Sequence, residues 1–239
     1  MQEIGGRELK KFSEISIIYE DNHLLVVEKP VNIPSQPDCS RDKDLLTLLK
    51  EYIKIKYNKP GNVYLGLVHR LDRPVGGVMV FAKTSKAASR LSEQIRNGNF
   101  KKTYLAVVHG KLDETSGTLE HYLLKNTRTN IVSIVDKDTH GAKKAILDYR
   151  WIGYSDSLSL VKIQLHTGRP HQIRVQLSGI GNPIYGDQKY GASVNKKGQQ
   201  IALWSNEVMF LHPTLKEKVV FTSNPPNVEP WSKFQALDE

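Results

Sequence analysis

The sequence predicts an α+β protein with a mixed, mostly antiparallel sheet flanked by helices. Three observations predict this class. Short β-rich runs outnumber helical stretches, and many of these runs follow one another at the spacing of hairpins. The chain has 239 residues, of which 39% are hydrophobic and 25% charged, as in a globular protein with a sizeable core.

The first half of the chain is predicted to alternate strands with helices. The expected elements are strands 15–19 and 23–28, a helix from 45 to about 58, a strand through 78–80, and a helix from 86 to 97. Acidic Asp42 and Asp44 precede the first helix, whose leucine and isoleucine residues recur on one face. Thr84 or Ser85 is the expected N-cap of the second helix, and Gly98 its expected end.

The second half is predicted to be richer in strands. Residues 103–110 form a nearly continuous apolar run, which indicates a strand buried on both faces. The remaining expectations are several strands within 118–166, a short helix over 172–178 that ends at Gly179, and closing strands near 208–211 and 219–222.

The charge of the chain points to a polyanionic partner. The net charge is +9, and residues 69–104 alone hold eight Lys or Arg against two acids. We therefore expect nucleic-acid binding, although a basic surface also serves solubility or contact with anionic membranes. No apolar run approaches the length of a membrane span, and the N-terminus lacks the apolar region of a secretory signal.

The cysteine content indicates the compartment. Cys39 is the single cysteine, so an internal disulfide framework and a Cys-rich zinc site are excluded. A reducing compartment fits this composition, and the cytoplasm is the expected location. The sequence holds no dinucleotide-binding glycine motif, no P-loop and no clustered metal ligands, so neither a cofactor nor a metal is expected.

The segment HRLDRPVGG, residues 69–77, is the strongest chemical signal. Asp72 stands between Arg70 and Arg73 and close to His69. Nearby positive charge lowers the pKa of a carboxyl group, so an ionised Asp72 can act as a nucleophile or base towards a polyanion. The alternative is a surface aspartate neutralised by its neighbouring arginines.

A second basic segment, HTGRPHQIRVQL, covers residues 166–177. Arg169 and Arg174 can each make bidentate contacts to carboxylate or phosphate groups, and His171 lies between them. A basic helix start on the surface is the plainer interpretation. Two Arg-rich segments, one of which contains a lone aspartate, favour a shared cleft.

Three motifs in order resemble the RluA-type RNA pseudouridine synthases. They are HRLDRPVGGVMVFAKT, KKTYLAVVHG and TGRPHQIRVQLSGIGNPIYGDQKYG, and the similarity extends from about residue 18 to about residue 225. The resemblance implies a pseudouridine synthase catalytic domain with a central RNA-binding cleft. It also implies isomerisation of specific uridines in structured RNA, either tRNA or large-subunit rRNA.

The resemblance assigns roles to individual residues. Asp72 matches the catalytic aspartate, and Arg70 matches the arginine that helps take the target nucleotide out of its stack. Tyr104 matches the tyrosine that stacks on the target base, and Arg174 matches the basic residue that pairs with the aspartate. We thus expect Asp72, Tyr104 and Arg174 to be catalytic. The residues expected to bind substrate are His69, Arg70, Arg73, Arg169, His171 and Leu203.

One late motif departs from the family pattern. Leu203 matches the apolar position beside the base, but Trp204 and Ser205 stand where the family usually has His-Ala. This departure indicates altered packing around the base pocket. It does not affect the match at Asp72.

The expected domain organisation is an N-terminal arm, residues 1–14, followed by one catalytic domain, residues 15–239. Because the catalytic pattern begins by about residue 18, we expect no separate S4-like RNA-binding domain. A monomer is expected. Two alternatives stay open: a non-catalytic RNA-binding protein with the same fold, and a nucleoside glycosylase that uses a carboxylate near C1′.

Overall fold

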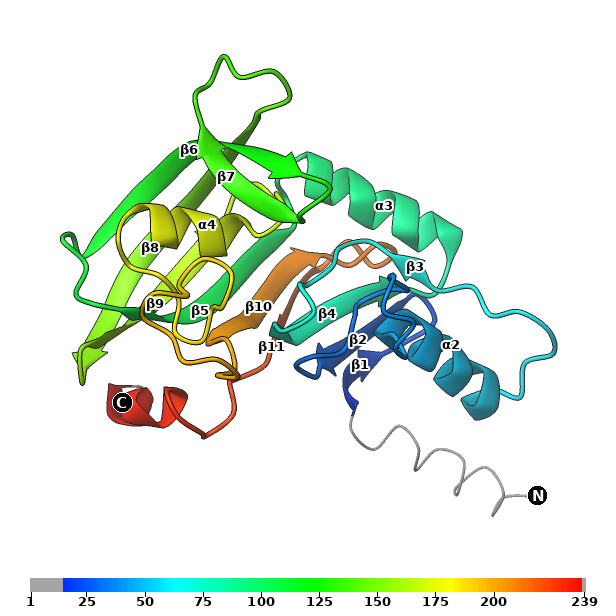
Figure 1. The fold of residues 1–239 in the computed structure, drawn as a ribbon. Coiled ribbons are helices and arrows are strands. Elements are labelled where there is room, and N and C mark those ends of the chain that lie inside the picture. The colour runs from blue at the N-terminus through cyan, green and yellow to red at the C-terminus, as the bar shows by residue number, and fades with distance from the viewer. Residues whose placement is uncertain (1–14, 238–239) are drawn as a thin grey trace. The chain divides into compact units, whose positions relative to one another are not determined.

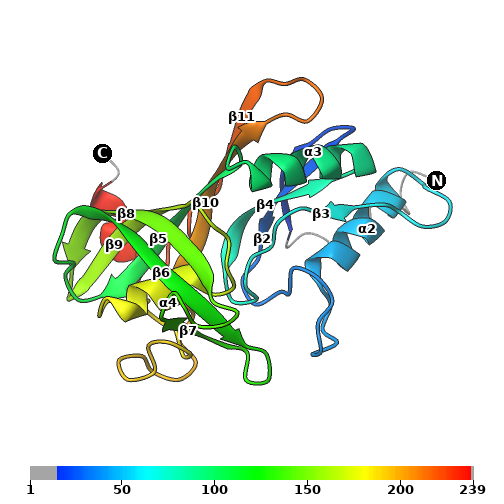
Figure 2. The ribbon, with the colours of Figure 1, turned by 90° about the horizontal axis from the view of Figure 1, so that it is seen from above.

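The computed structural model describes residues 15–237 (Figures 1 and 2). The predicted arm, residues 1–14, lies outside the described residues. The described chain divides into two compact units: unit 1 comprises residues 15–100 and 207–223, and unit 2 comprises residues 101–206 and 224–237. The prediction of one catalytic domain over residues 15–239 stays a prediction.

Unit 1 contains a small sheet and two helices. Its elements are β1 (Ser16–Glu20), β2 (Leu24–Lys29), α2 (Leu45–Lys56), β3 (Gly66–Leu67), β4 (Gly76–Ala82), α3 (Ser85–Arg96), the end of β10, and β11 (Lys218–Thr222). Strand β2 pairs antiparallel with both β1 and β4, β3 pairs with β4, and β11 pairs antiparallel with β10. Helix α3 packs against β3 and β4.

The caps that the sequence predicts define both helices of unit 1. The side chain of Asp44 accepts a 3.0 Å hydrogen bond from the backbone N of Thr47 at the start of α2. Thr84 likewise accepts a 3.1 Å hydrogen bond from the backbone N of Ala87. Gly98, with φ at +71°, follows the end of α3 as expected.

The core of unit 1 lies where α3 covers the sheet. Aliphatic and aromatic side chains from both form one buried cluster: Leu24, Val26, Val78, Val80, Ala82, Ala87, Leu91, Phe100, Val208 and Phe210. Burial of this kind supplies the main favourable term in folding. It also gives the loop before β4 a rigid support.

Unit 2 contains a larger antiparallel sheet and one α-helix. Its elements are β5 (Lys101–His109), β6 (Ser116–Asn126), β7 (Ile131–Val135), β8 (Lys143–Ser155), β9 (Leu158–Leu165), α4 (Gln172–Gly179), the start of β10 (Leu203–Leu211), and a 3₁₀ helix, η2 (Trp231–Leu237). The strands β5, β9, β8, β6 and β7 follow one another in this order across the sheet, and each pair is antiparallel. Helix α4 packs against β6 and β7 (Figure 1).

The structure confirms the α+β class and all three predicted α-helices. It adds β3 and η2, which the sequence pattern did not indicate. Strand β10 begins at Leu203, earlier than the sequence predicts. Polar residues such as Ser205 interrupt the apolar pattern there, but the sheet buries Ser205. No helix within residues 15–237 is long and apolar enough to cross a membrane.

Candidate active site

The loop that carries Asp72 is held on both sides by hydrogen bonds within unit 1. On one side, the Ser35 hydroxyl donates to the carbonyl oxygen of Leu71 at 2.7 Å and accepts from the N of Leu71 at 3.2 Å. On the other side, the Lys29 ammonium donates to the carbonyl oxygen of Arg73 at 3.0 Å. The residues before and after Asp72 are therefore both fixed. A carboxylate placed in this way loses little conformational freedom when substrate binds.

Lys29 brings positive charge to this loop. It lies at the end of β2 and is fully buried, and its ammonium also donates to the carbonyl oxygen of Pro30 at 2.9 Å. Burial lowers the pKa of Lys29 to about 7, although the negative charge of Asp72 opposes this shift and the positive charge of Arg73 adds to it. The hydrogen bond to Arg73 places the Lys29 ammonium against the backbone of the residue that follows the predicted catalytic carboxylate.

Sequence patterns did not point to Lys29 as a site residue. The only signal was a lysine closing the apolar run LLVVEK, at a position where the strand pattern predicts burial. Lysine is almost never fully buried without a partner, so a lysine in such a run marks a local requirement for charge.

His69 has a structural contact in unit 1. Its Nε2 atom accepts a 3.0 Å hydrogen bond from the backbone N of Val80, and its ring lies 5.4 Å from the ring of Phe100. These contacts join the start of the HRLD loop to β4 and to the core. The predicted role of His69 in substrate binding stays a prediction.

The two arginines that flank Asp72 differ in their surroundings. Arg70 is exposed to solvent. Arg73 forms an ion pair with Asp42 and donates from Nε to the carbonyl oxygen of Asn32 at 3.2 Å. Arg70 is therefore the arginine of the loop that is most available to a ligand, whereas the Arg73 side chain already has an acidic partner.

Unit 2 contributes Tyr104 and Leu203. Tyr104 lies in β5 opposite Ile163 of β9 and is only 6% exposed. Leu203 begins β10 and is buried, as are Trp204 and Ser205 after it. The Trp204-Ser205 pair is thus accommodated inside the sheet, and the altered packing around a base pocket stays a prediction.

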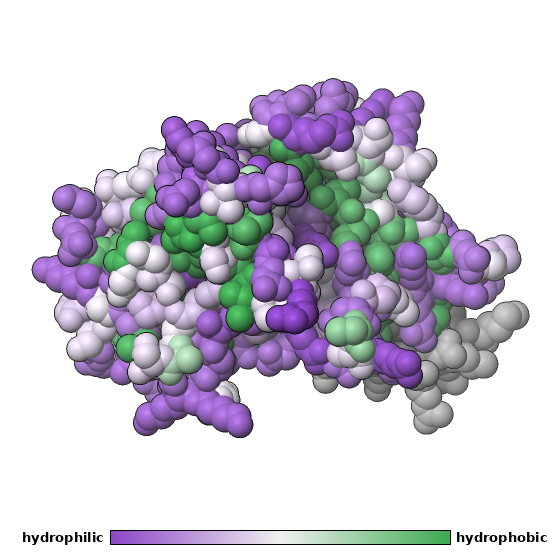
Figure 3. Space-filling model, turned by 45° about the horizontal axis from the view of Figure 1, so that its top comes forward, coloured by the Kyte–Doolittle hydropathy of each residue, from purple (hydrophilic) through white to green (hydrophobic). Residues whose placement is uncertain are grey.

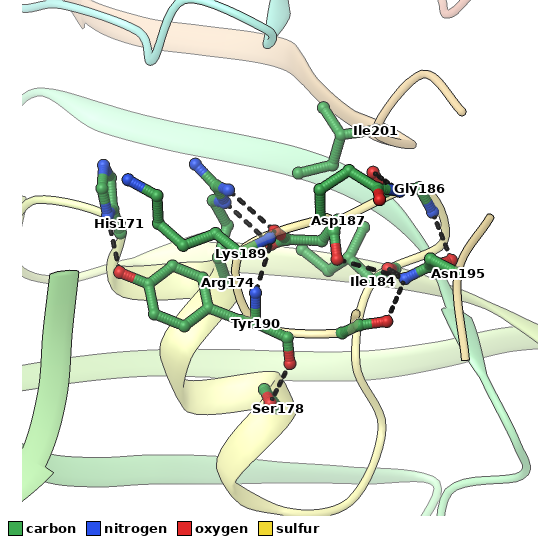
Figure 4. Close-up of polar contacts among 12 residues, drawn as sticks. His171, Arg174, Ser178, Ile184, Gly186, Asp187, Lys189, Tyr190, Asn195 and Ile201 are labelled. Carbon is green, nitrogen blue, oxygen red and sulfur yellow. Dashed lines mark hydrogen bonds and ion pairs between the residues drawn. The ribbon is translucent and has the colours of Figure 1, made fainter. Parts of the chain in front are cut away.

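Arg174 is held by a carboxylate in unit 2 (Figure 4). Its Nε and Nη2 atoms donate to the two carboxylate oxygens of Asp187 at 2.8 and 2.7 Å, and both side chains are buried. This bidentate geometry matches the planar guanidinium to the planar carboxylate. Asp187 therefore fixes the orientation of Arg174.

Asp187 stays ionised in this buried position. Burial raises its pKa, but the hydrogen bonds and positive charge of Arg174 outweigh this effect, and the backbone N atoms of Lys189 and Tyr190 lower the pKa further. The net result is a pKa below the ordinary value. From the sequence, Asp187 is expected only to shape a loop, because nothing in NPIYGD indicates its pairing with Arg174.

Tyr190 connects His171 to the same cluster. Its hydroxyl oxygen lies 2.7 Å from Nδ1 of His171 and accepts a 2.9 Å hydrogen bond from the N of Val132. The Arg174 guanidinium carbon lies 5.2 Å from the centre of the Tyr190 ring, within range of a cation–π contact. Arg174 and His171 are thus brought together in unit 2 (Figure 4).

Arg169 anchors the loop that precedes α4. Its backbone N donates to Oε1 of Gln172 at 3.0 Å, and its Nε donates to the carbonyl oxygen of Lys144 at 2.9 Å. Its remaining guanidinium nitrogens give this loop a positive charge. Figure 3 shows hydrophilic residues over much of the face that it draws, around a region of hydrophobic residues.

The predicted catalytic residues come from both units. Asp72 belongs to unit 1, whereas Tyr104 and Arg174 belong to unit 2. The predicted pairing of Arg174 with Asp72 joins the two units and stays a prediction. Each unit nevertheless contains a defined arrangement of charged groups. In unit 1 the buried Lys29 ammonium holds the loop of Asp72. In unit 2 the Asp187 carboxylate orients Arg174.

Comparison with known sequences identifies relatives of this chain. The family model described as RNA pseudouridylate synthase matches residues 23–179. An uncharacterized RNA pseudouridine synthase of Bacillus subtilis, YhcT, is 32% identical over 219 residues, which make up 89% of this chain and 69% of the relative. The ribosomal large subunit pseudouridine synthase D of Zymomonas mobilis is 32% identical over 224 residues, again 89% of this chain and 69% of the relative.

Solved structures support the same fold. The structure of human RNA pseudouridylate synthase domain containing 4 matches with a TM-score of 0.72 and 23% identity, over 95% of this chain and 94% of that chain. The family model, the relatives in sequence and the motifs around Asp72, Tyr104 and Arg174 all indicate the same family. This chain belongs to the RNA pseudouridylate synthase family and is an isomerase that acts on RNA.

Proposed function

We propose that this pseudouridine synthase modifies large-subunit ribosomal RNA and that Asp72 is its catalytic carboxylate. The observation that carries the residue assignment is the rigid loop, in which Ser35 and Lys29 hold the residues on either side of Asp72. The choice of RNA rests on relatives named as ribosomal large subunit pseudouridine synthases. The sequence motifs leave tRNA and large-subunit rRNA open as substrates, and this proposal selects the rRNA.

The reaction breaks the bond between N1 of uracil and C1′ of ribose and forms a bond between C5 and C1′. C5 loses a proton and N1 gains one, so the atoms balance without an oxidant or a second substrate. Asp72 supplies the carboxylate by one of three routes: attack at C6 of the base, addition to C1′, or removal of a ribose proton. In each route the ionised form of Asp72 is the reactive one.

Tyr104 and Arg174 act on the flipped uridine and on Asp72. A target base must leave its stack, which costs a few kcal/mol. Stacking on the ring of Tyr104 returns about 1–3 kcal/mol of that cost. To Arg174, oriented by Asp187, we assign the pairing with Asp72 that the family resemblance implies.

RNA binding depends on the basic residues around these groups. We assign contacts with the RNA to exposed Arg70 and to Arg169, and recognition mainly to RNA shape and phosphates. His69, Arg73, His171 and Leu203 complete the proposed substrate-binding set. We further propose that the enzyme acts as a monomer in the cytoplasm, where its one exposed cysteine, Cys39, would stay reduced.

The test is tritium release from RNA labelled at C5 of uridine. Wild-type protein should release tritium from large-subunit rRNA, and Asp72→Ala should release none. Asp138→Ala, which removes an exposed carboxylate from unit 2, serves as the matched control and should keep full activity. Release by Asp72→Ala would overturn the assignment of the carboxylate, and release from tRNA alone would overturn the choice of RNA.

Product analysis separates this proposal from the two alternatives. An isomerase leaves the number of bases in the RNA unchanged and produces pseudouridine. A glycosylase would release free uracil and leave an abasic site. A non-catalytic RNA-binding protein would bind the same RNA without any C5 exchange.

A further inference from the structure

Lys102 is a partly buried cation of unit 2 that has no hydrogen-bond or ion-pair partner within residues 15–237. It lies near the start of β5 and is shielded from much of the solvent. Within residues 15–237 it forms no hydrogen bond and no ion pair, and burial by itself lowers the pKa of its ammonium. Desolvating a charge without a partner costs stability, so such a residue needs an explanation outside the folded protein.

The position of Lys102 places it among the predicted catalytic residues of unit 2. Successive side chains of a strand point to opposite faces, so Lys102 and Tyr104 share one face of β5. The Lys102 ammonium also lies against the turn at Gly168, where a Cβ atom would be 3.3 Å from Nζ. This turn leads directly into α4, the helix that carries Arg174.

We propose that Lys102 binds a backbone phosphate of the substrate RNA beside the target uridine. This inference rests on the proposed function, because it requires RNA to lie along the Tyr104 face of β5. A phosphate supplies the negative charge and the acceptor oxygens that the ammonium lacks within residues 15–237, and lysine is a compact point charge suited to it.

The choice of phosphate over the uracil ring follows from charge. The carbonyl oxygens of uracil are neutral acceptors, and they would leave most of the ammonium charge uncompensated. A phosphate of the flipped nucleotide carries a full negative charge at neutral pH. It is also present at every nucleotide, whatever the sequence around the target.

The neighbouring Lys101 offers a matched control. It lies in the same strand and carries the same charge, but the strand alternation points it to the opposite face from Tyr104. Lys101→Met and Lys102→Met therefore remove one positive charge each, from the same strand and with similar side-chain length. Only the second removes it from the proposed phosphate site.

The first experiment measures the salt dependence of binding to oligouridylate, with the wild type and both variants. Loss of one phosphate contact should lower the slope of log affinity against log salt by about 0.7, the value per contact for a single strand. We expect this change, with about tenfold weaker binding at low salt, in Lys102→Met and not in Lys101→Met. Equal slopes in all three proteins would overturn the proposal.

A second measurement distinguishes a binding role from a structural one. If the role of Lys102 is to bind phosphate, Lys102→Met removes a desolvated charge that no ion pair compensates in the free protein. The variant should then unfold at the same temperature as the wild type or at a higher one. A lower melting temperature would show that Lys102 supports the fold, and would overturn the proposal.

Neutral RNA analogues identify the group that is bound. Oligouridylate with methylphosphonate linkages keeps its bases but loses its backbone charge, and should bind the wild type and Lys102→Met equally well. Continued discrimination between the two proteins would point to the base instead and overturn the assignment. These experiments measure binding and not turnover. An absence of tritium release would therefore count against the proposed function, but it would not change the conclusion about phosphate binding by Lys102.

Discussion

The ammonium of Lys29 donates a 3.0 Å hydrogen bond to the carbonyl oxygen of Arg73, the residue that follows Asp72. The two partners are 44 residues apart in the sequence. The bond joins the end of β2 to the HRLD loop and brings a buried positive charge close to the proposed catalytic carboxylate. One residue therefore both positions the loop and influences its electrostatics.

Replacement of Lys29 by methionine should impair catalysis. Lys29→Met removes the donor to the Arg73 and Pro30 carbonyl oxygens and the positive charge that Lys29 carries in its protonated form. Hydrogen bonds from charged groups contribute about 1.5–3 kcal/mol, so we expect kcat to fall about tenfold to a hundredfold. Initial rates of tritium release measure this effect.

Lys43→Met is the control for this experiment, because Lys43 is exposed on the surface of the same unit. It should retain the kcat of the wild type. If Lys29→Met also retained it, Lys29 would have no positioning role in the reaction.

Loss of the Asp187 carboxylate charge should destabilise unit 2. Asp187→Asn removes the charged partner that the buried guanidinium of Arg174 has within unit 2, which we expect to cost about 3–5 kcal/mol of unfolding free energy. Urea unfolding measures this cost. The double variant Asp187→Asn, Arg174→Gln should lose less than the sum of the single losses, since the two residues act as a pair. Additive losses would contradict the pairing.

Glu20 should make the stability of unit 1 sensitive to acid. Burial raises the pKa of Glu20, but hydrogen bonds from Lys56, Lys83 and Tyr57 and the charge of Lys83 outweigh it and lower the pKa to about 2. The ordinary value is 4.5, so the unfolded chain binds more protons between these two pH values. The stabilisation is complete above about pH 4.5 and is lost as the pH falls towards 2.

The comparison of Glu20→Gln with the wild type tests this dependence. Their difference in unfolding free energy should be largest near pH 6 and shrink as the pH falls from 4.5 to 2. Glu51→Gln, which alters an exposed residue of α2, should show no such trend. A difference that stays constant over this range would contradict the lowered pKa of Glu20.

Alanine at Gly186 should destabilise the loop that contains Asp187. Gly186 has φ at +77°, and a Cβ atom there would overlap the carbonyl oxygen of Gln200. Gly181 has φ at +84°, and no atom lies within 4 Å of the place a Cβ would take, so Gly181→Ala measures the backbone strain by itself. We expect Gly181→Ala to cost about 1–2 kcal/mol of unfolding free energy and Gly186→Ala clearly more. Equal costs would show that the loop moves aside.

The local sequence predicts most elements of the fold. The caps at Asp44 and Thr84, the glycine after α3 and the one-faced apolar patterns of the helices are features of neighbouring residues. They depend only on residues close in the chain, so the sequence by itself predicts the α+β class. The same holds for the family motifs around Asp72, Tyr104 and Arg174, which are contiguous runs of residues.

The tertiary structure decides which groups surround these motifs. Lys29 meets the HRLD loop, and Asp187 meets Arg174, only after the chain has folded. The burial of Lys102 without a hydrogen-bond or ion-pair partner in the described part of the chain likewise depends on how the sheet packs. The sequence by itself determined the family motifs and the residues proposed for the chemistry, because motifs are local. Folding decided the surroundings and orientation of these residues, because burial and partners depend on residues distant in the chain.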